Sequence, residues 1–233
     1  MRARVCISRY SRSSAVKLIV LDFLPISTTP PSVDIYIVSW KLNIVQLIKR
    51  YYTSDFIIKY VPFGCSKREE HYKLTDPFCN FYLRFVENED RLSNDFWLSN
   101  IESQNIVTWR GIAFENVCFN HIDQIKKALG ISGVSTTQSA WSKRKGDEAG
   151  TQIDMLIERK DNIVNMCEIK FYGTEFVVDK NYDRVLRNRI SLLSGEISSK
   201  MAIHSTLITT YGLKYNEYSG AFVNVIDMDA LFD

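Results

Sequence analysis

The sequence has few of the features that mark membrane, zinc-binding or disulfide-rich secreted proteins. No apolar run approaches the roughly 20 residues of a transmembrane helix, and the longest candidates, residues 18–24 and 33–40, are interrupted by Asp22 and Asp34. The five cysteines are widely spaced without a CxxC pair, and histidine occurs only three times. This spacing supports no tetrahedral zinc site and is typical of free thiols in a reducing cytosol. We therefore expect a cytoplasmic protein with no membrane partner.

An excess of charge of one sign is also absent. The chain carries 29 lysines and arginines against 27 aspartates and glutamates, which leaves a net charge of +2. Long-range attraction therefore gives no argument for nucleic-acid binding, and any contact with DNA must come from local basic patches. With 233 residues, of which 45% are hydrophobic, the chain is long enough for one large or two small domains with a buried core.

The first part of the chain is hard to interpret. Residues 1–40 begin with arginines and serines, and no acidic residue occurs before Asp22. A targeting peptide can look like this, but we prefer to interpret the segment as a poorly specified start to a truncated chain.

Residues 41–103 resemble the second half of a winged helix with a connecting helix behind it. The pattern predicts a short helix over 43–52, then strands over 56–61 and 70–74 that are joined by a turn at 62–64. Asp76 and Pro77 are a typical helix start. The helix that follows carries an aromatic stripe, which we interpret as core packing; its members are Phe78, Phe81, Tyr82 and Phe85.

Residues 104–233 predict a mixed α/β domain, because helical and strand patterns alternate along them. The predicted order is a helix, three strands, a helix and two strands. The elements are a helix over 107–129 that Gly130 caps, strands over 134–141, 151–158 and 163–171, a helix over 180–193, strands over 205–210 and 221–226, and a helical turn over 228–232; a charged loop over 142–150 and a tight turn over 159–162 join the first three strands.

Two predicted strands carry the residues that suggest chemistry. Side chains alternate along a strand, so Glu168 and Lys170 point to one face. The turn between the strands is centred near Asp161, and antiparallel pairing mirrored about it places Asp154 opposite Glu168. Two carboxylates side by side repel each other. Mg²⁺ relieves this better than a lysine does, because it takes one or two carboxylates and keeps several waters.

This pattern resembles the PD-(D/E)xK signature of restriction-endonuclease-like nucleases. Asp154 is followed fourteen residues later by Glu168, Ile169 and Lys170, and Glu115 on the preceding helix matches an extra acidic residue of many such enzymes. Ile153 stands where the signature has proline. The resemblance implies a mixed sheet flanked by helices. It also implies Mg²⁺ on Asp154 and Glu168, with the Ile169 carbonyl as an extra ligand, Lys170 at the attacking water, and Glu115 holding the lysine or a second metal.

A second resemblance covers most of residues 50–233. Four segments are similar, in order, to the C-terminal half of bacterial and archaeal AAA-type ATPases, which combine a P-loop domain, a winged helix and a nuclease-like domain. The segments are residues 72–78 (YKLTDPF), 109–115 (WRGIAFE), 152–154 (QID) and 208–213 (ITTYGL). The P-loop motif GxxxxGK[ST] is absent from this sequence, so we expect no ATP site here. DNA and an ATPase-family protein are the partners that the resemblance implies.

Several other polar residues are weaker candidates. Gln152 shares the predicted face of Asp154 and either positions substrate or is an ordinary strand residue. His121 lies on an apolar helix face and is better interpreted as a core histidine. The basic residues of the next helix suit a DNA backbone, but a solvated face is the commoner explanation; they are Lys180, Arg184 and Arg187, with Lys143, Arg144 and Lys145 as further candidates.

The sequence thus predicts a restriction-endonuclease-like domain over 104–233, behind a winged-helix remnant. Its predicted function is Mg²⁺-dependent hydrolysis of DNA phosphodiesters, with Glu115, Asp154, Glu168 and Lys170 as site residues. The alternatives are a catalytically inactive DNA-binding or interaction module derived from an ATPase, and a degraded product without an independent role. If Asp154, Glu168 and Lys170 converge in one site, the nuclease prediction is favoured over these alternatives.

Overall fold

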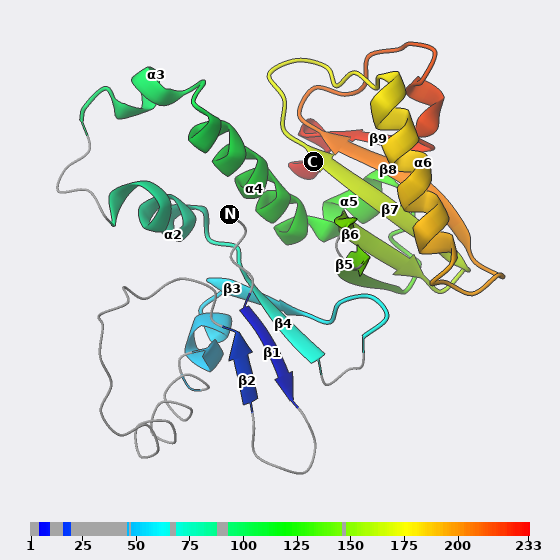
Figure 1. Cartoon of the computed structure of the whole chain (residues 1–233), viewed down its shortest axis with the longest axis horizontal. Coiled ribbons are helices and arrows are strands. Elements are labelled where there is room, and N and C mark those ends of the chain that lie inside the picture. The colour runs from blue at the N-terminus through cyan, green and yellow to red at the C-terminus, as the bar shows by residue number, and fades with distance from the viewer. Residues whose placement is uncertain are drawn as a thin grey trace. The chain divides into compact units, whose positions relative to one another are not determined.

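The computed structural model of the chain describes residues 5–9, 16–19, 46, 48–65, 69–87, 93–145 and 148–233 (Figure 1). They belong to two compact units. The first comprises Met1–Val61 and Cys65–Asp90, and the second comprises Pro62–Gly64 and Arg91–Asp233. Within the described ranges, no helix is both long and apolar enough to cross a membrane.

The first unit is built on a four-stranded antiparallel sheet in the order β2-β1-β4-β3. The predicted hairpin is confirmed by β3 (Ile57–Tyr60) and β4 (Glu69–Leu74), and residues 48–53 are helical as expected. The other two strands, β1 (Val5–Arg9) and β2 (Val16–Ile19), come from the segment that the sequence left unassigned. The sheet is thus larger than a winged-helix hairpin alone.

The helix after this sheet begins as predicted but does not bury its whole aromatic stripe. Asp76 caps α2 (Pro77–Phe81), its Oδ1 accepting a hydrogen bond from the Cys79 N–H at 2.6 Å. Phe78 is 72% exposed and Tyr82 is 44% exposed, so core packing is a wrong prediction for these two rings. The chain continues as a π-helical turn, η1 (Tyr82–Val86), which changes the angular spacing that the α-helical pattern assumed.

The second unit contains a five-stranded mixed sheet in the order β5-β6-β7-β8-β9. The first three strands are antiparallel, whereas β8 and β9 run parallel to β7. The parallel step from β7 to β8 needs a crossover, which α6 supplies (Figure 1). The predicted order of strands and helices is confirmed; the elements are α3 (Phe96–Asn100), α4 (Gln104–Asn120), α5 (Ile122–Ala128), β5 (Thr136–Lys145), β6 (Glu148–Arg159), β7 (Ile163–Lys170), α6 (Lys180–Ser194), β8 (Ala202–Thr209), η2 (Ser219–Ala221), β9 (Asn224–Asp227) and η3 (Asp229–Leu231).

The long helix predicted over 107–129 is two helices. The chain leaves the α-helical conformation at His121 (φ −108°, ψ 35°), which ends α4 and precedes α5. Apolar spacing continues through this break, so a pattern of apolar residues alone does not reveal it. The predicted cap is confirmed at Gly130, which has the positive φ of +68° that ends many helices.

The charged loop predicted over 142–150 is also wrong. Both strands extend into it as a hairpin, and Lys145 pairs with Glu148. Backbone hydrogen bonds continue a strand pair whatever the side chains are, so charge is a weak signal for a loop. The side chains of Lys143, Arg144 and Lys145 lie outside the described residues, so their predicted role in a basic patch stays a prediction.

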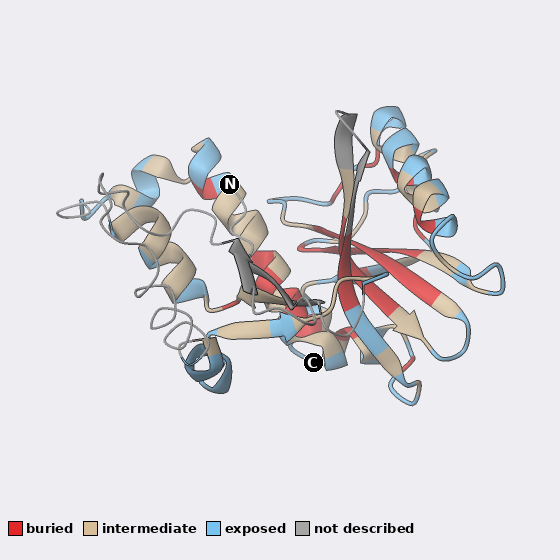
Figure 2. Cartoon of the chain, turned by 60° about the horizontal axis from the view of Figure 1, so that its bottom comes forward, coloured by how far each residue is buried: buried red, intermediate tan, exposed pale blue. Residues whose placement is uncertain are grey.

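The core of the second unit lies where β6, β7 and β8 cross its centre (Figure 2). Leu156 and Met166 are opposite each other on β6 and β7, and both are fully buried. They join Leu186 and Leu193 of α6 in one hydrophobic cluster. The helix therefore packs on the face of the sheet that carries Leu156 of β6 and the even-numbered residues of β7.

A capping residue fixes where α6 begins. Oδ1 of Asp179 accepts a hydrogen bond from the Tyr182 N–H at 2.7 Å. We expect Asp179→Ala to lower the free energy of unfolding by about 1 kcal/mol, measured by urea denaturation. Asp123→Ala is the matched control, because its carboxylate is 87% exposed and pairs only at the surface with Lys126. Equal losses in both variants would show that the cap does not stabilise this helix.

Candidate functional site

The pairing of β6 with β7 is the register that the turn predicted. Met155 lies opposite Cys167 and Leu156 opposite Met166, so the pairs are mirrored about Asp161. Asp154 and Glu168 are the next residues along the two strands. Local chain geometry alone therefore brings the two carboxylates to the same place on the sheet.

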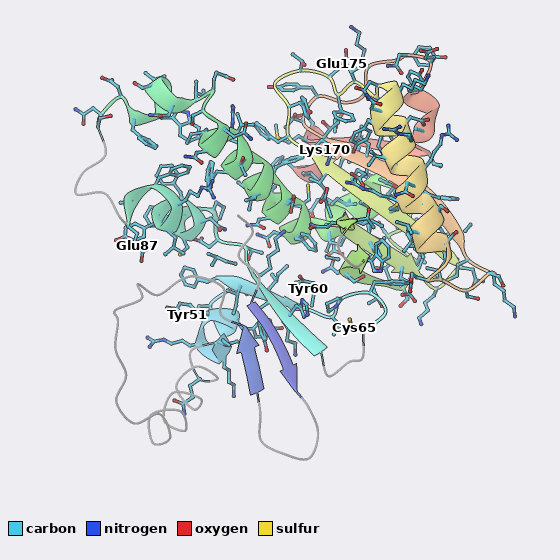
Figure 3. All side chains as sticks on the ribbon, viewed as in Figure 1. Tyr51, Tyr60, Cys65, Glu87, Lys170 and Glu175 are labelled. Atoms are coloured by element: carbon cyan, nitrogen blue, oxygen red, sulfur yellow. The ribbon has the colours of Figure 1, made fainter. Side chains whose placement is uncertain are left out.

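Lys170 joins these two carboxylates. Its Nζ lies 3.6 Å from Oδ2 of Asp154 and 3.5 Å from Oε2 of Glu168. Glu168 is fully buried and the Asp154 side chain is 8% exposed, whereas the Lys170 side chain, at 25%, reaches solvent. Lys170 is labelled in Figure 3. The N–H of Ile169 donates to Oδ2 of Asp154 at 3.2 Å, which orients this carboxylate.

Two residues of α6 complete the environment of Glu168. Nη1 of Arg189 donates to Oε1 of Glu168 at 2.6 Å and also contacts Oε2. The hydroxyl of Tyr182 donates to Oε2 at 2.9 Å. Burying a carboxylate costs free energy unless it is paired and hydrogen-bonded. The hydrogen bonds from Arg189 and Tyr182, together with the Lys170 ammonium, stabilise Glu168 in this way.

The group is balanced in charge by side chains alone. Asp154 and Glu168 contribute two negative charges, and Lys170 and Arg189 contribute two positive charges. Burial opposes the charged form of Arg189, but the neighbouring Glu168 carboxylate outweighs this and raises the pKa of the guanidinium. Burial, and then the charge of Glu168, raise the pKa of Tyr182, so its phenol stays a neutral donor.

The sequence analysis missed Tyr182 and Arg189, although a signal for them exists. Both residues lie at helical spacing with Leu186 and Leu193, which form the buried face of α6. A charged residue on the apolar face of a helix needs a partner inside the protein. Arg189 was therefore identifiable as a residue that reaches a buried acid.

The basic stripe that the sequence singled out lies on the solvent side of the same helix. All three of its residues are exposed: Lys180, Arg184 and Arg187. Arg187 pairs with Asp183 through a 2.8 Å contact of its Nε, and its side chain is 73% exposed. This geometry is that of a solvated helix face, and contact with a DNA backbone stays a prediction.

The other two candidates, Glu115 and Gln152, are both half-buried. Glu115 is half-buried on α4, where its neighbour Phe114 packs edge-on against Phe171. Gln152 is half-buried two residues before Asp154. In the described part of the chain, no three acidic, histidine or cysteine side chains are grouped closely enough to hold a metal ion. Roles for Glu115 and Gln152 in the chemistry therefore stay predictions.

His121 is half-buried, and not fully in the core as we expected. It lies at the junction of α4 and α5, and its ring packs 5.1 Å from that of Phe232. This contact joins the α4–α5 junction to the end of the chain, and both of its residues are distant in sequence from Asp154 and Glu168. Nothing about it suggests a catalytic base.

Asp154 and Glu168 have the oxygen donors that Mg²⁺ prefers. Both reach the same ammonium group, so a cation between them would meet an oxygen from each strand. The fit has one condition, because the oxygens of Glu168 already accept hydrogen bonds from Arg189 and Tyr182. A bound ion would have to share these oxygens or displace one of the donors.

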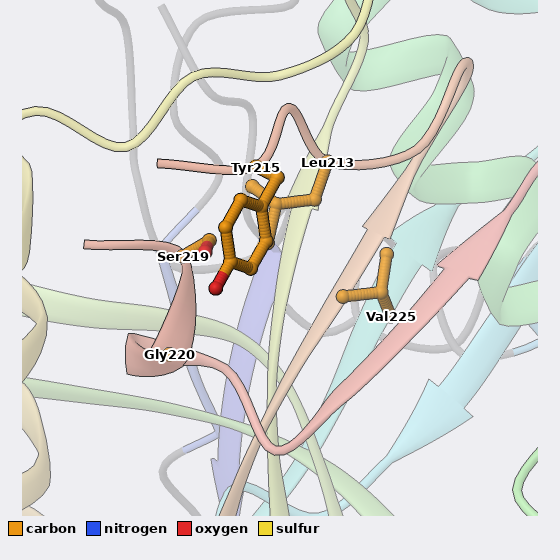
Figure 4. A pocket seen from close by; sticks show the side chains of 5 residues that line it. All are labelled: Leu213, Tyr215, Ser219, Gly220 and Val225. Atoms are coloured by element: carbon orange, nitrogen blue, oxygen red, sulfur yellow. The ribbon is translucent and has the colours of Figure 1, made fainter. Parts of the chain in front are cut away.

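A shallow pocket of about 330 Å³ lies elsewhere in the second unit (Figure 4). It contains no carboxylate, amine or imidazole, and none of its residues belongs to the group around Glu168. Tyr215 is 92% exposed, so the pocket is open. It offers no acid–base chemistry; the lining residues are Leu213, Tyr215, Ser219, Gly220 and Val225.

Comparison with known proteins adds little to this geometry. No protein-family model and no curated protein matches the sequence. Among solved structures, the chain is similar to one titled "Crystal Structure of Protein of Unknown Function AF1548", at 15% identity and a TM-score of 0.32. The match covers 49% of this chain and 64% of that one, so the chain spans less than two thirds of its length. A likeness this distant carries no functional argument.

Proposed function

We propose that residues 104–233 form a restriction-endonuclease-like domain that hydrolyses DNA phosphodiesters with Mg²⁺. The observation that carries this proposal is the convergence of Asp154, Glu168 and Lys170, whose ammonium lies within 3.6 Å of both carboxylates. A five-stranded mixed sheet with helices packed on it supports the proposal, because this is the architecture that the PD-(D/E)xK resemblance implies.

Each residue of the site has a distinct task in this reaction. Asp154 and Glu168 would hold the ion, and the Ile169 N–H keeps Asp154 oriented. Mg²⁺ bound there supplies an activated water and neutralises charge on the phosphate. Lys170 is the only one of the three that reaches solvent appreciably, so it orients the attacking water or stabilises the developing negative charge. Glu115 would hold the lysine or a second ion.

DNA would be held by positive charge near the site. The exposed residues Lys180, Arg184 and Arg187 lie along α6, the helix that also contacts Glu168. Contacts with phosphates weaken steeply as salt rises. The resemblance to AAA-type ATPases further suggests that the chain works beside an ATPase partner.

A second candidate is a catalytically inactive DNA-binding or interaction module. It is favoured by the balance of charge around Glu168, where Lys170 and Arg189 already compensate both acids. A site whose carboxylates are fully paired has less need of a metal ion than a bare pair has. In this case the group would stabilise the packing of α6 on the sheet rather than perform chemistry.

The test is a plasmid cleavage assay in Mg²⁺ or Mn²⁺ with a DNA-binding measurement beside it. We expect cleavage by the wild type that EDTA abolishes, and a loss of at least about 100-fold in Asp154→Asn. Asp161→Asn is the matched control, because this exposed residue of the adjoining turn pairs with Arg159 rather than with the residues around Glu168. Equal cleavage by all three proteins would refute the mechanism, and binding without cleavage would support the inactive module.

A further inference from the structure

We propose that Arg189 is a built-in counter-cation of Glu168 that competes with the divalent ion for this carboxylate. Binding of the ion then requires the guanidinium to release at least one carboxylate oxygen. This inference rests on the proposed function, because it concerns the same site. It adds a positioning role for two residues of α6, Tyr182 and Arg189, that the sequence pattern did not assign.

The contacts of Glu168 show the competition directly. Its Oε1 accepts a hydrogen bond from Arg189 at 2.6 Å, and its Oε2 is contacted by Arg189, Tyr182 and Lys170. Both oxygens that an ion would use are therefore already engaged. Hydrogen bonds between ionised partners are among the strongest in proteins, so the guanidinium is a substantial competitor.

Electrostatics acts in the same direction. An ion coordinated by Glu168 would lie at about 2.0–2.1 Å from its oxygen, next to a guanidinium that is 2.6 Å from Oε1. Glu168 is fully buried, so water screens little of the repulsion between the two cations. Removing the charge of Arg189 should therefore favour the ion.

The two donors of α6 differ in what cation binding does to them. Tyr182 is neutral, so its hydroxyl can keep its hydrogen bond to Oε2 when a cation arrives. Arg189 carries charge and is repelled. Its Nε is buried and has no hydrogen-bond partner among the described residues, so no hydrogen bond at Nε opposes a movement of the guanidinium. Tyr182 thus keeps Glu168 oriented, while Arg189 releases at least one oxygen of this carboxylate.

Isothermal titration of Mn²⁺ into the purified chain tests this competition. We expect Arg189→Gln to bind Mn²⁺ about tenfold more tightly than the wild type, because one repelling charge is removed. Arg189→Lys keeps the positive charge and should stay near the wild type. Arg187→Gln is the matched control on the same helix, because the exposed Arg187 side chain pairs with Asp183 and not with Glu168, and it should also match the wild type.

The outcomes separate the two proposals. If the wild type binds Mn²⁺ and Arg189→Gln binds it equally or more weakly, the competition is wrong and the metal site stands. If neither the wild type nor any folded variant binds Mn²⁺, the metal site is wrong and the competition falls with it. If Arg189→Gln is unfolded without metal, recovery of its circular dichroism signal on adding Mn²⁺ supports the competition, and absence of recovery overturns it.

Discussion

Arg189→Met should lower the free energy of unfolding by about 3–5 kcal/mol, the cost of breaking a buried ion pair. The variant leaves Glu168 fully buried without the guanidinium that contacts both of its oxygens. The Arg189 side chain is 22% exposed, so solvent screens this pair only in part. Urea denaturation measures this loss, provided that the slope of the unfolding free energy against urea concentration is unchanged.

Two further variants show whether the buried charge causes this loss. Adding Glu168→Gln to Arg189→Met removes the buried carboxylate that has lost one of its two cations, so the double variant should recover much of the stability. Arg187→Met breaks a pair with Asp183 on the same helix whose arginine is 73% exposed, so it should cost less than Arg189→Met. A cost for Arg189→Met no greater than that of Arg187→Met would contradict a buried, paired Glu168.

Lys170→Met should reduce the rate of phosphodiester hydrolysis by about 10²–10³-fold, as expected for the loss of one group that stabilises developing charge. Lys170 is one of two cations beside the carboxylates, so its removal should leave Mn²⁺ binding intact or stronger. Methionine keeps the apolar stem of the side chain near the Tyr182 ring, which the ammonium approaches at 6.0 Å.

Comparing kcat with KM for DNA identifies what Lys170 does. A group that acts in the transition state changes kcat, whereas a group that only binds DNA changes KM. We expect the change in kcat with retained Mn²⁺ binding, and some loss of unfolding free energy because Lys170 pairs with two buried carboxylates. Asp154→Asn is the contrasting variant, because it should lose both hydrolysis and Mn²⁺ affinity. A Lys170→Met protein that cleaves as fast as the wild type would remove Lys170 from the mechanism.

The site was predictable because its determinants are local. The turn at Asp161 and the alternation of side chains were enough to predict the register of β6 and β7. Asp154, Glu168 and Lys170 lie on these two strands, so the register alone brings them together. Glu115 lies on another element, α4, so the register of the two strands does not determine its position and its role stays a prediction.

The errors in the predicted fold also have physical reasons. The break at His121 interrupts the backbone but not the apolar spacing, so the pattern predicted one helix instead of α4 and α5. The β5–β6 hairpin continues through charged residues because backbone pairing, rather than side-chain polarity, sustains it. Tyr82 begins a π-helical turn, η1, which changes the angular spacing that the α-helical pattern assumed; the exposure of Phe78, which precedes this turn, has no such explanation.

The order of the elements in the second unit, and the two strands that carry the acidic residues, could be predicted from the sequence alone. This was possible because strand alternation and a tight turn act over a few residues. The contacts of Arg189 and Tyr182 with Glu168 are visible only in the tertiary structure. These contacts join residues 21 and 14 positions apart, and they exist because α6 packs on that face of the sheet. The local pattern thus predicted the carboxylates, and the packing of a helix selected their partners.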